Sequence, residues 1–205
     1  HAKKDNPELL KAQELGLKIY SYPEYVYEQA KDKTRVVIGG SHGKTSITSM
    51  ILHVLQEQNI AFDYLVGAQL DGFETMVSFT DAPIMVIEGD EYLSSPIDRR
   101  PKFHLYKPNI ALLSGIAWDH INVFPTYENY VEQFEIFVDS IVSGGILVFN
   151  EEDLELKRIA DTTTNQIRKH GYTTPEYSIE DGITILNTPE GELPIELFGA
   201  HNLNN

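Results

Sequence analysis

The clearest indication of function in this sequence is the run Gly40-Ser41-His42-Gly43-Lys44-Thr45-Ser46. A β-branched, apolar segment precedes this run and a segment with helical spacing follows it. Backbone N–H groups and the positive end of a helix dipole would therefore converge there on an anion. Lys44 can reach the β and γ oxygens of a nucleotide, and the Thr45 hydroxyl can ligate magnesium. The run predicts a phosphate-binding loop, and an ordinary glycine-rich turn before a helix is the alternative.

The spacing of this loop differs from that of the general nucleotide-binding motif. That motif has four residues between its two glycines, which would place a glycine at position 38, where this chain has Ile38. The glycines that are present, Gly40 and Gly43, still let the backbone approach phosphate oxygens without a clash from a Cβ atom. The loop therefore departs from the general motif while keeping the groups that bind phosphate.

Two polar stretches follow apolar segments that are typical of buried strands. Glu88-Gly89-Asp90-Glu91 comes directly after one such segment, and Trp118-Asp119-His120 follows another by a short loop. Side chains at the carboxyl edge of a parallel sheet lie where ligands bind, and magnesium needs few protein carboxylates besides water and phosphate. We expect one of the carboxylates Glu88, Asp90 and Glu91 to hold a cation, and His120 to ligate metal or contact phosphate. A solvated acidic loop and a structural histidine are the alternatives.

The end of the chain is rich in amides. His201, Asn202 and Asn205 lie in the run Gly199-Ala200-His201-Asn202-Leu203-Asn204-Asn205. Side-chain amides offer paired donors and acceptors that suit the edge of a nucleotide base. A capped loop is the alternative interpretation of this run.

Short apolar segments alternate with segments of helical spacing along the chain. Continuous apolar runs are typical of strands covered on both faces of a parallel sheet, and they occur at 84–87, 110–113 and 146–149. The mostly β-branched and apolar residues at 34–38 predict a further strand. Periodicity and capping residues predict helices beginning near Asn6 and Ser21, and over 45–58, 127–142 and 153–160. A brief strand is predicted at 17–20, and a hairpin from 182–186 and 193–197. The fold class is α/β, a mostly parallel sheet with flanking helices and a P-loop, plus a small antiparallel β patch near the C-terminal end.

Composition narrows the class of protein. The 205 residues are 41% hydrophobic, which supports a folded core, and 16 Lys and Arg against 31 Asp and Glu give a formal net charge of −15. Such a charge argues against nucleic acid as a partner, and the basic cluster Arg99, Arg100 and Lys102 is interpreted as a surface balanced by nearby acids. The chain has no cysteine and no apolar run of about 18 residues, so we expect a cytoplasmic protein with no membrane insertion. Motifs of serine hydrolases, zinc proteases and dehydrogenases are absent from the sequence.

Taken together and in this order, the loop at 40–45, Glu88 with Asp90-Glu91, Asp119-His120 and the run at 201–205 resemble the ATP-binding central domain of the Mur ligases. The shortened phosphate loop of that family accounts for Ile38. The resemblance implies that residues 34–205 form this central domain and that residues 1–33 are the tail of an N-terminal UDP-sugar-binding domain with a linker. A C-terminal acceptor-binding domain would lie outside the chain, and the chain alone would be inactive in ligation.

Within the family, His42 and the stretch 88–92 resemble the branch that uses UDP-N-acetylmuramate. The run at 98–103, and Trp118-Asp119-His120 with Phe124, resemble the member that attaches a recycled L-alanyl-γ-D-glutamyl-meso-diaminopimelate tripeptide. The member that adds L-alanine is the alternative. Several Mur ligases use a carbamylated lysine near the metal, but residues 127–143 contain no lysine, so we do not expect that modification in this stretch.

The resemblance implies an ATP-dependent amide-bond-forming ligase of peptidoglycan synthesis or recycling. The carboxylate of UDP-N-acetylmuramate would attack the γ-phosphate of ATP, and an amino acid or peptide would capture the acyl phosphate. Lys44 would stabilise the transferring phosphoryl group, Thr45 and Glu88 would hold one Mg²⁺, and His120 would help to hold a second. By the same resemblance, His201, Asn202 and Asn205 would contact adenine or its surroundings, and Asn204 would have no role. A non-catalytic ATP-binding regulatory domain is the alternative from another class, and a folyl-polyglutamate ligase is a more distant one.

Overall fold

The computed structural model, which describes residues 3–119 and 121–205, is built around a seven-stranded sheet with the order β3-β2-β4-β1-β5-β6-β7. All neighbouring strands pair in parallel except β2 and β3, which are antiparallel. β1 therefore lies in the middle of the sheet, and the parallel strands end at one common edge. The strands are β1 (Thr34–Gly39), β2 (Phe62–Leu65), β3 (Val77–Ser78), β4 (Ile84–Glu88), β5 (Ile110–Leu113), β6 (Ile146–Asn150) and β7 (Arg168–Tyr172).

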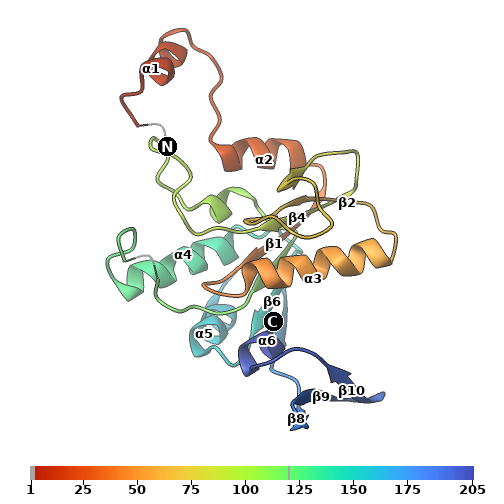
Figure 1. Ribbon diagram of the computed structural model, residues 1–205. Coiled ribbons are helices and arrows are strands. Elements are labelled where there is room, and N and C mark those ends of the chain that lie inside the picture. The colour runs from red at the N-terminus through yellow and green to blue at the C-terminus, as the bar shows by residue number, and fades with distance from the viewer. Residues whose placement is uncertain (1–2, 120) are drawn as a thin grey trace.

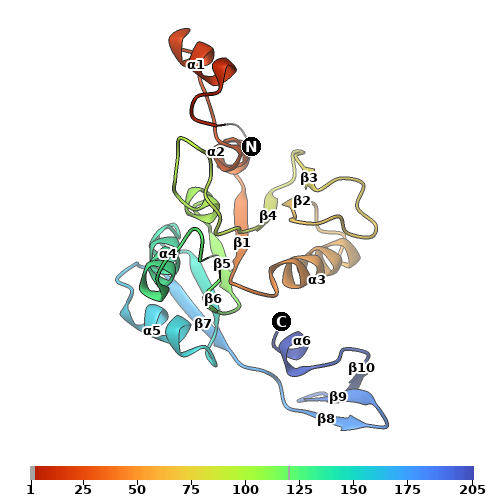
Figure 2. The same ribbon diagram turned by 60° about the vertical axis from the view of Figure 1, so that its left-hand side comes forward.

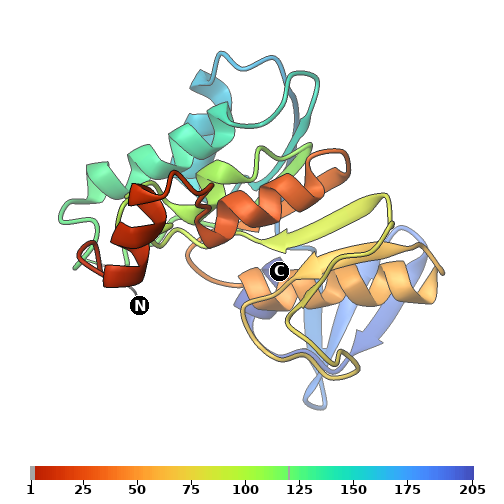
Figure 3. The same ribbon diagram turned by 90° about the horizontal axis from the view of Figure 1, so that it is seen from above.

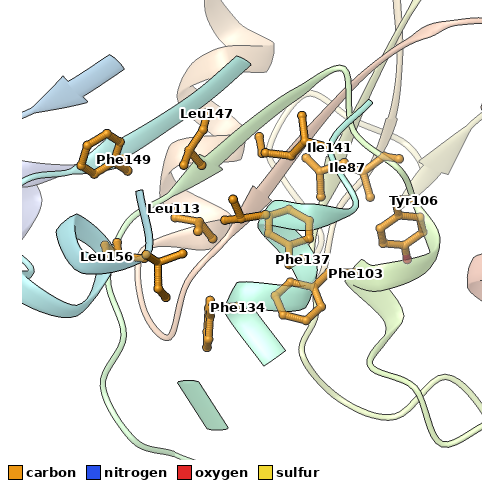
Figure 4. Packing of buried hydrophobic residues seen from close by; sticks show 14 of the residues in the cluster. Ile87, Phe103, Tyr106, Leu113, Phe134, Phe137, Ile141, Leu147, Phe149 and Leu156 are labelled. Atoms are coloured by element: carbon orange, nitrogen blue, oxygen red, sulfur yellow. The ribbon is translucent and has the colours of Figure 1, made fainter. Parts of the chain in front are cut away.

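The sheet is covered by helices on both faces, as the alternating sequence pattern predicts. α3 (Lys44–Glu57) lies on one face, and α4 (Tyr127–Asp139) and α5 (Leu154–Thr162) lie on the other (Figures 2 and 3). Successive residues of β1 point to opposite faces, so Val37 joins the core beneath α4 while Ile38 joins the core beneath α3. The larger core packs Phe103 against Phe137, with ring centroids 4.6 Å apart (Figure 4).

Local capping residues begin these helices where the sequence predicts. Thr126 accepts a hydrogen bond from the backbone N–H of Asn129 and begins α4, and Asp153 accepts from the N–H groups of Glu155 and Leu156 and begins α5. Such caps satisfy N–H groups that have no partner within the helix. The predicted helices at 45–58 and 153–160 are confirmed within two residues, and the one predicted to reach Val142 ends at Asp139.

The N-terminal segment contains two helices. α1 (Pro7–Glu14) projects away from the sheet (Figure 1). α2 (Tyr22–Ala30), in contrast, buries Val26 and Ala30 in the larger core. Residues 17–20, predicted as a strand, lie outside any helix or strand. The prediction is wrong because a strand needs a neighbour for its backbone groups, and no described strand pairs with this segment.

A second, smaller sheet follows the large one. It has three antiparallel strands, β8 (Tyr177–Glu180), β9 (Ile183–Thr188) and β10 (Gly191–Ile195), in the order β10-β9-β8. This confirms the predicted hairpin and antiparallel patch, with a tighter turn than predicted. Figures 1 and 2 show this sheet and the last helix, α6 (Ala200–Asn204), below the large sheet, on the side where α3 begins. Among the described residues, no helix combines the length and apolar character needed to cross a membrane.

Candidate functional site

The loop between β1 and α3 has the backbone shape of an anion-binding turn. Gly40 has φ +129° and Gly43 has φ +80°, conformations that residues with a Cβ atom rarely adopt. A Cβ on Gly40 would lie 2.2 Å from Oγ of Ser114, so this position also needs glycine for packing. Gly43 begins α3 without a side-chain cap, which leaves the first N–H groups of a 14-residue helix available to an anion.

The side chain of Lys44 folds back over this loop toward Gly40. Its Nζ donates a hydrogen bond to the carbonyl oxygen of Gly40 at 2.7 Å and lies 3.0 Å from Oε2 of Glu91. The Glu91 side chain is 1% exposed and the Lys44 side chain 16% exposed. Glu91 is therefore the ion-pair partner of the phosphate-loop lysine.

Thr45 and Glu88 lie together, as the sequence predicts for a magnesium site. The Thr45 hydroxyl donates to Oε1 of Glu88 at 2.9 Å, and the backbone N–H of Gly67 donates to Oε2 of the same carboxylate at 2.9 Å. Among the described residues, no group of three or more His, Cys, Asp or Glu side chains is arranged to hold a metal. A hydroxyl and one carboxylate fit Mg²⁺, which prefers oxygen ligands and keeps water and phosphate in its shell.

Hydrogen bonds fix the loop against the end of β5. Ser41 Oγ lies 2.9 Å from the Tyr130 hydroxyl and accepts from the backbone N–H of Ala117 at 2.9 Å. The Ser114 hydroxyl donates to the carbonyl oxygen of His42 at 2.6 Å. Tyr130 is fully buried, and burial is the main cause that raises the pKa of its hydroxyl, so it stays protonated. The loop is thus held by neutral groups beneath it.

Two cavities meet at this loop. One of about 240 Å³ is lined by Ser41 to Ser46 and Glu88. The other, of about 490 Å³, is also lined by Lys44 and Glu88, and it extends to Tyr92, Lys102 and Tyr106. Lys44 and Glu88 therefore border both spaces. A larger hollow of about 970 Å³ shares Tyr92 and Lys102 with the second cavity and extends to Lys3 and Lys4.

The C-terminal run comes back to the same loop. The side chain of Asn205 lies against Gly43. A Cβ atom added to this glycine would be only 2.3 Å from Oδ1 of Asn205. Asn202 donates from Nδ2 to the carbonyl oxygen of Phe198 at 2.7 Å, and the exposed ring of His201 lies over Gly199. Asn205 is therefore beside the loop, while Asn202 and His201 lie on the short helix that leads to it.

The structure describes the predicted site residues with one exception. Gly40, Ser41, His42, Gly43, Lys44, Thr45, Ser46 and Glu88 gather at the loop, whereas His120 lies outside the described residues. Two members of the basic cluster are balanced by acids, as predicted, since Arg100 contacts Asp98 and Lys102 contacts Asp90. The sequence analysis missed Ser114, which directly follows β5, and Asn150, which ends β6. A polar residue at the end of an apolar strand is the signal that identified Glu88, and it could have identified these two residues.

Comparisons with known proteins identify the family of this chain. The Mur ligase middle domain family matches residues 38–205. The chain is 30% identical over 203 residues to UDP-N-acetylmuramate–L-alanine ligase of Rhodococcus erythropolis, covering 97% of this chain and 39% of that protein. It is 28% identical over 156 residues to the UDP-N-acetylmuramate–L-alanyl-gamma-D-glutamyl-meso-2,6-diaminoheptandioate ligase of Haemophilus influenzae, covering 76% of this chain and 34% of that protein.

A solved structure is similar along almost the whole chain. It is UDP-N-acetylmuramate:L-alanyl-gamma-D-glutamyl-meso-diaminopimelate ligase from Neisseria meningitides, with a TM-score of 0.83 and 26% identity, covering 99% of this chain and 68% of that chain. The chain thus spans between a third and two fifths of the length of the two curated relatives.

Proposed function

Since the chain belongs to the Mur ligase family, we propose that it is the ATP-binding central domain of an amide-bond-forming ligase of peptidoglycan synthesis or recycling. In this proposal residues 34–205 form that domain, and residues 1–33 are the end of a UDP-sugar-binding domain with a linker. The protein would act in the cytoplasm, where its nucleotide substrates are found.

The observation that carries the proposal is the position of Lys44 and Glu88 between two cavities. The smaller cavity is lined by the phosphate loop and suits the triphosphate of ATP. The larger one is lined by the same two residues and suits a second substrate. A γ-phosphate held at Lys44 would then face the group that attacks it. This arrangement suits phosphoryl transfer between two bound molecules.

The reaction needs no protein nucleophile. A carboxylate oxygen of UDP-N-acetylmuramate attacks the γ-phosphorus, and the bond to the bridging oxygen breaks, so ADP leaves and an acyl phosphate forms. The acceptor amine then attacks the acyl carbon, inorganic phosphate leaves, and the amine loses a proton. Lys44 and the N–H groups of α3 stabilise the charge that develops on the transferring group.

Magnesium and adenine would be held by residues around the loop. Thr45 and Glu88 provide oxygen ligands for Mg²⁺, and the bound ion would neutralise charge on the phosphates. Asn205, beside Gly43, and Asn202 and His201 on α6 would contact the adenine or its surroundings. His120 would ligate a second ion.

For the acceptor we propose the L-alanyl-γ-D-glutamyl-meso-diaminopimelate tripeptide. The run at 98–103 supports this choice, and so does the similarity to the Neisseria structure, whose name specifies that tripeptide. A second candidate, the addition of L-alanine, is supported by the 30% identity to the Rhodococcus protein. A regulatory domain that binds ATP without forming a bond is the remaining alternative.

The test is phosphate release by the intact protein with ATP, Mg²⁺ and UDP-N-acetylmuramate. One reaction receives the tripeptide and a parallel reaction receives L-alanine. Release with the tripeptide and little with L-alanine is the expected result. The opposite pattern would identify the L-alanine-adding activity. No release with either acceptor, together with measurable ATP binding, would favour the regulatory domain.

A further inference from the structure

α6 brings the proposed adenine-contacting residues to the phosphate loop, yet little within the helix explains how it stays there. It has five residues and begins at Gly199 without a side-chain cap. A helix of this length is not stable by itself in water. α6 buries one apolar side chain, Leu203, which is 8% exposed and lies outside both hydrophobic clusters. One buried leucine gives the helix no defined rotation or register, so polar contacts with the large sheet are needed to orient it.

These contacts converge on the side chain of Asn204. Its Oδ1 accepts a hydrogen bond from Nδ2 of Asn150 at 2.9 Å. Its Nδ2 donates to Oγ1 of Thr174 at 2.9 Å and to Oε2 of Glu152 at 3.2 Å. One carboxamide thus joins α6 to the end of β6 and to the segment after β7. A bond between two side-chain amides uses the donor and acceptor of each with defined orientation.

Asn150 continues this connection toward the phosphate loop. It is 8% exposed, and its Nδ2 also donates to the carbonyl oxygen of Ser114 at 3.2 Å. Its Oδ1 accepts from the backbone N–H of Glu152 at 2.9 Å. Ser114, in turn, donates from its hydroxyl to the carbonyl oxygen of His42 in the loop. Hydrogen bonds therefore run without a break from α6 through two strand ends to the phosphate loop.

We propose that Asn204 is a positioning residue for the nucleotide, which holds α6 so that Asn202 and Asn205 lie in register with the phosphate loop. The contact of Asn205 with Gly43 is the outcome of this placement. The inference rests on the proposed function, because it presumes that the loop binds a nucleotide. It assigns to Asn204 a part that the sequence did not suggest.

The test is nucleotide binding by the chain and by its variant Asn204→Leu, which keeps the volume and removes all three hydrogen bonds. ADP and GDP are titrated in the presence of Mg²⁺ by calorimetry, and the melting temperature is recorded. We expect the variant to bind ADP about tenfold more weakly, which corresponds to a loss of about 1.4 kcal/mol. GDP binding should change less, so the preference for ADP falls. The melting temperature should stay close to that of the wild type.

The matched control is Asn187→Leu, at an exposed position of β9, which should bind ADP as the wild type does. The single variant Asn150→Ala and the double variant Asn150→Ala with Asn204→Leu are titrated in the same way. The double variant should bind ADP no more weakly than the weaker-binding of the two single variants, because the two amides act as one unit. If Asn204→Leu does not fold, Thr174→Val removes one of the three bonds and should weaken ADP binding two- to threefold.

Two results would overturn the positioning role. One is that Asn204→Leu, or Thr174→Val where the first variant does not fold, binds ADP with wild-type affinity and with the wild-type preference over GDP. The other is an equal loss for ADP and GDP together with a lower melting temperature, which would make Asn204 a stabilising residue only. Failure of the proposed function looks different, because the wild-type chain would then bind neither nucleotide, or Lys44→Ala would bind both as the wild type does.

Discussion

The carboxylate of Glu91 lies 3.0 Å from the ammonium of Lys44, and both side chains are largely withdrawn from water. The Tyr130 hydroxyl also lies 3.4 Å from Oε1 of Glu91. A buried carboxylate so close to the phosphate-loop lysine fixes the position of that lysine and balances its charge. Removing one partner of such a pair leaves a charge that is poorly solvated.

We therefore expect Glu91→Gln, which keeps the shape and removes the charge, to lower the free energy of unfolding by about 1–3 kcal/mol. Urea denaturation measures this change. Lys44→Met should also be destabilising, and the double variant should lose less than the sum of the two single variants. Strict additivity would show that the two groups do not interact.

Magnesium dependence should report on Thr45 and Glu88. Thr45→Val keeps the shape and removes the hydroxyl that contacts Glu88, so the Mg²⁺ concentration needed for half-maximal ATP binding should rise about tenfold. Thr45→Ser retains the hydroxyl and is the matched control, expected within about twofold of the wild type. An unchanged Mg²⁺ requirement in Thr45→Val would remove this threonine from the metal site.

Arg35 should be a main determinant of stability. It is 4% exposed, and its guanidinium donates to five backbone carbonyl oxygens, those of Ala30, Lys31, Lys33, Tyr106 and Lys107. Burial is the main cause that lowers its pKa, but arginine stays charged at neutral pH.

Arg35→Met would leave these carbonyl groups without their donor and should cost about 2–4 kcal/mol in unfolding free energy. Arg168→Met, at an exposed position of β7, is the control and should stay within about 0.5 kcal/mol of the wild type. Equal stability of the two variants would contradict the role of Arg35 in joining α2 to the sheet.

His104 should make stability depend on pH. Burial is the main cause that lowers its pKa below the usual 6.5, and its Nε2 lies 2.8 Å from the carbonyl oxygen of Gln133. Below about pH 6.5 the unfolded chain binds a proton at this residue before the folded chain does. The contribution of His104 is therefore present above pH 6.5, falls as the pH drops, and levels off below the lowered pKa.

Urea denaturation between pH 5 and pH 8 tests this effect. His104→Gln retains a donor for Gln133 and lacks the titrating ring, so it should lose less stability than the wild type as the pH falls from 7 to 5. The slopes of unfolding free energy against pH should differ between the two proteins by at most about 1.4 kcal/mol per pH unit. Parallel curves for the two proteins would show that His104 titrates alike in the folded and unfolded states.

The parts of the fold that the sequence predicted are those in which one residue pattern dominates. Continuous apolar runs predicted β4, β5 and β6, because strands buried on both faces leave no polar alternation. β1 was predicted from mostly β-branched and apolar residues, although the charged Arg35 lies among them. β2 was missed because Asp63 stands in the middle of an apolar segment. The structure compensates this 0% exposed carboxylate with Lys33 and with the N–H and hydroxyl of Thr80. Those partners are distant in sequence, so no local pattern predicts them.

β7 was missed for the opposite reason. Arg168–Tyr172 is an edge strand of polar, mostly exposed residues, and backbone pairing with β6 alone defines it. The site follows the same rule. The loop at 40–46 and Glu88 could be predicted because each is a local motif, whereas the Glu91–Lys44 pair and the Asn150–Asn204 bond depend on which strand ends become neighbours.

The central claim is that the loop at 40–46 binds the phosphates of ATP. Calorimetric titration of ATP with Mg²⁺ into the wild-type chain, Lys44→Ala and Lys157→Ala tests it most directly. Lys157 is exposed on α5, so its variant carries the same change of charge away from the loop. We predict that Lys157→Ala binds like the wild type and that Lys44→Ala binds at least about tenfold more weakly. Wild-type affinity in Lys44→Ala would contradict the assignment of the phosphate loop and the ligase function built on it.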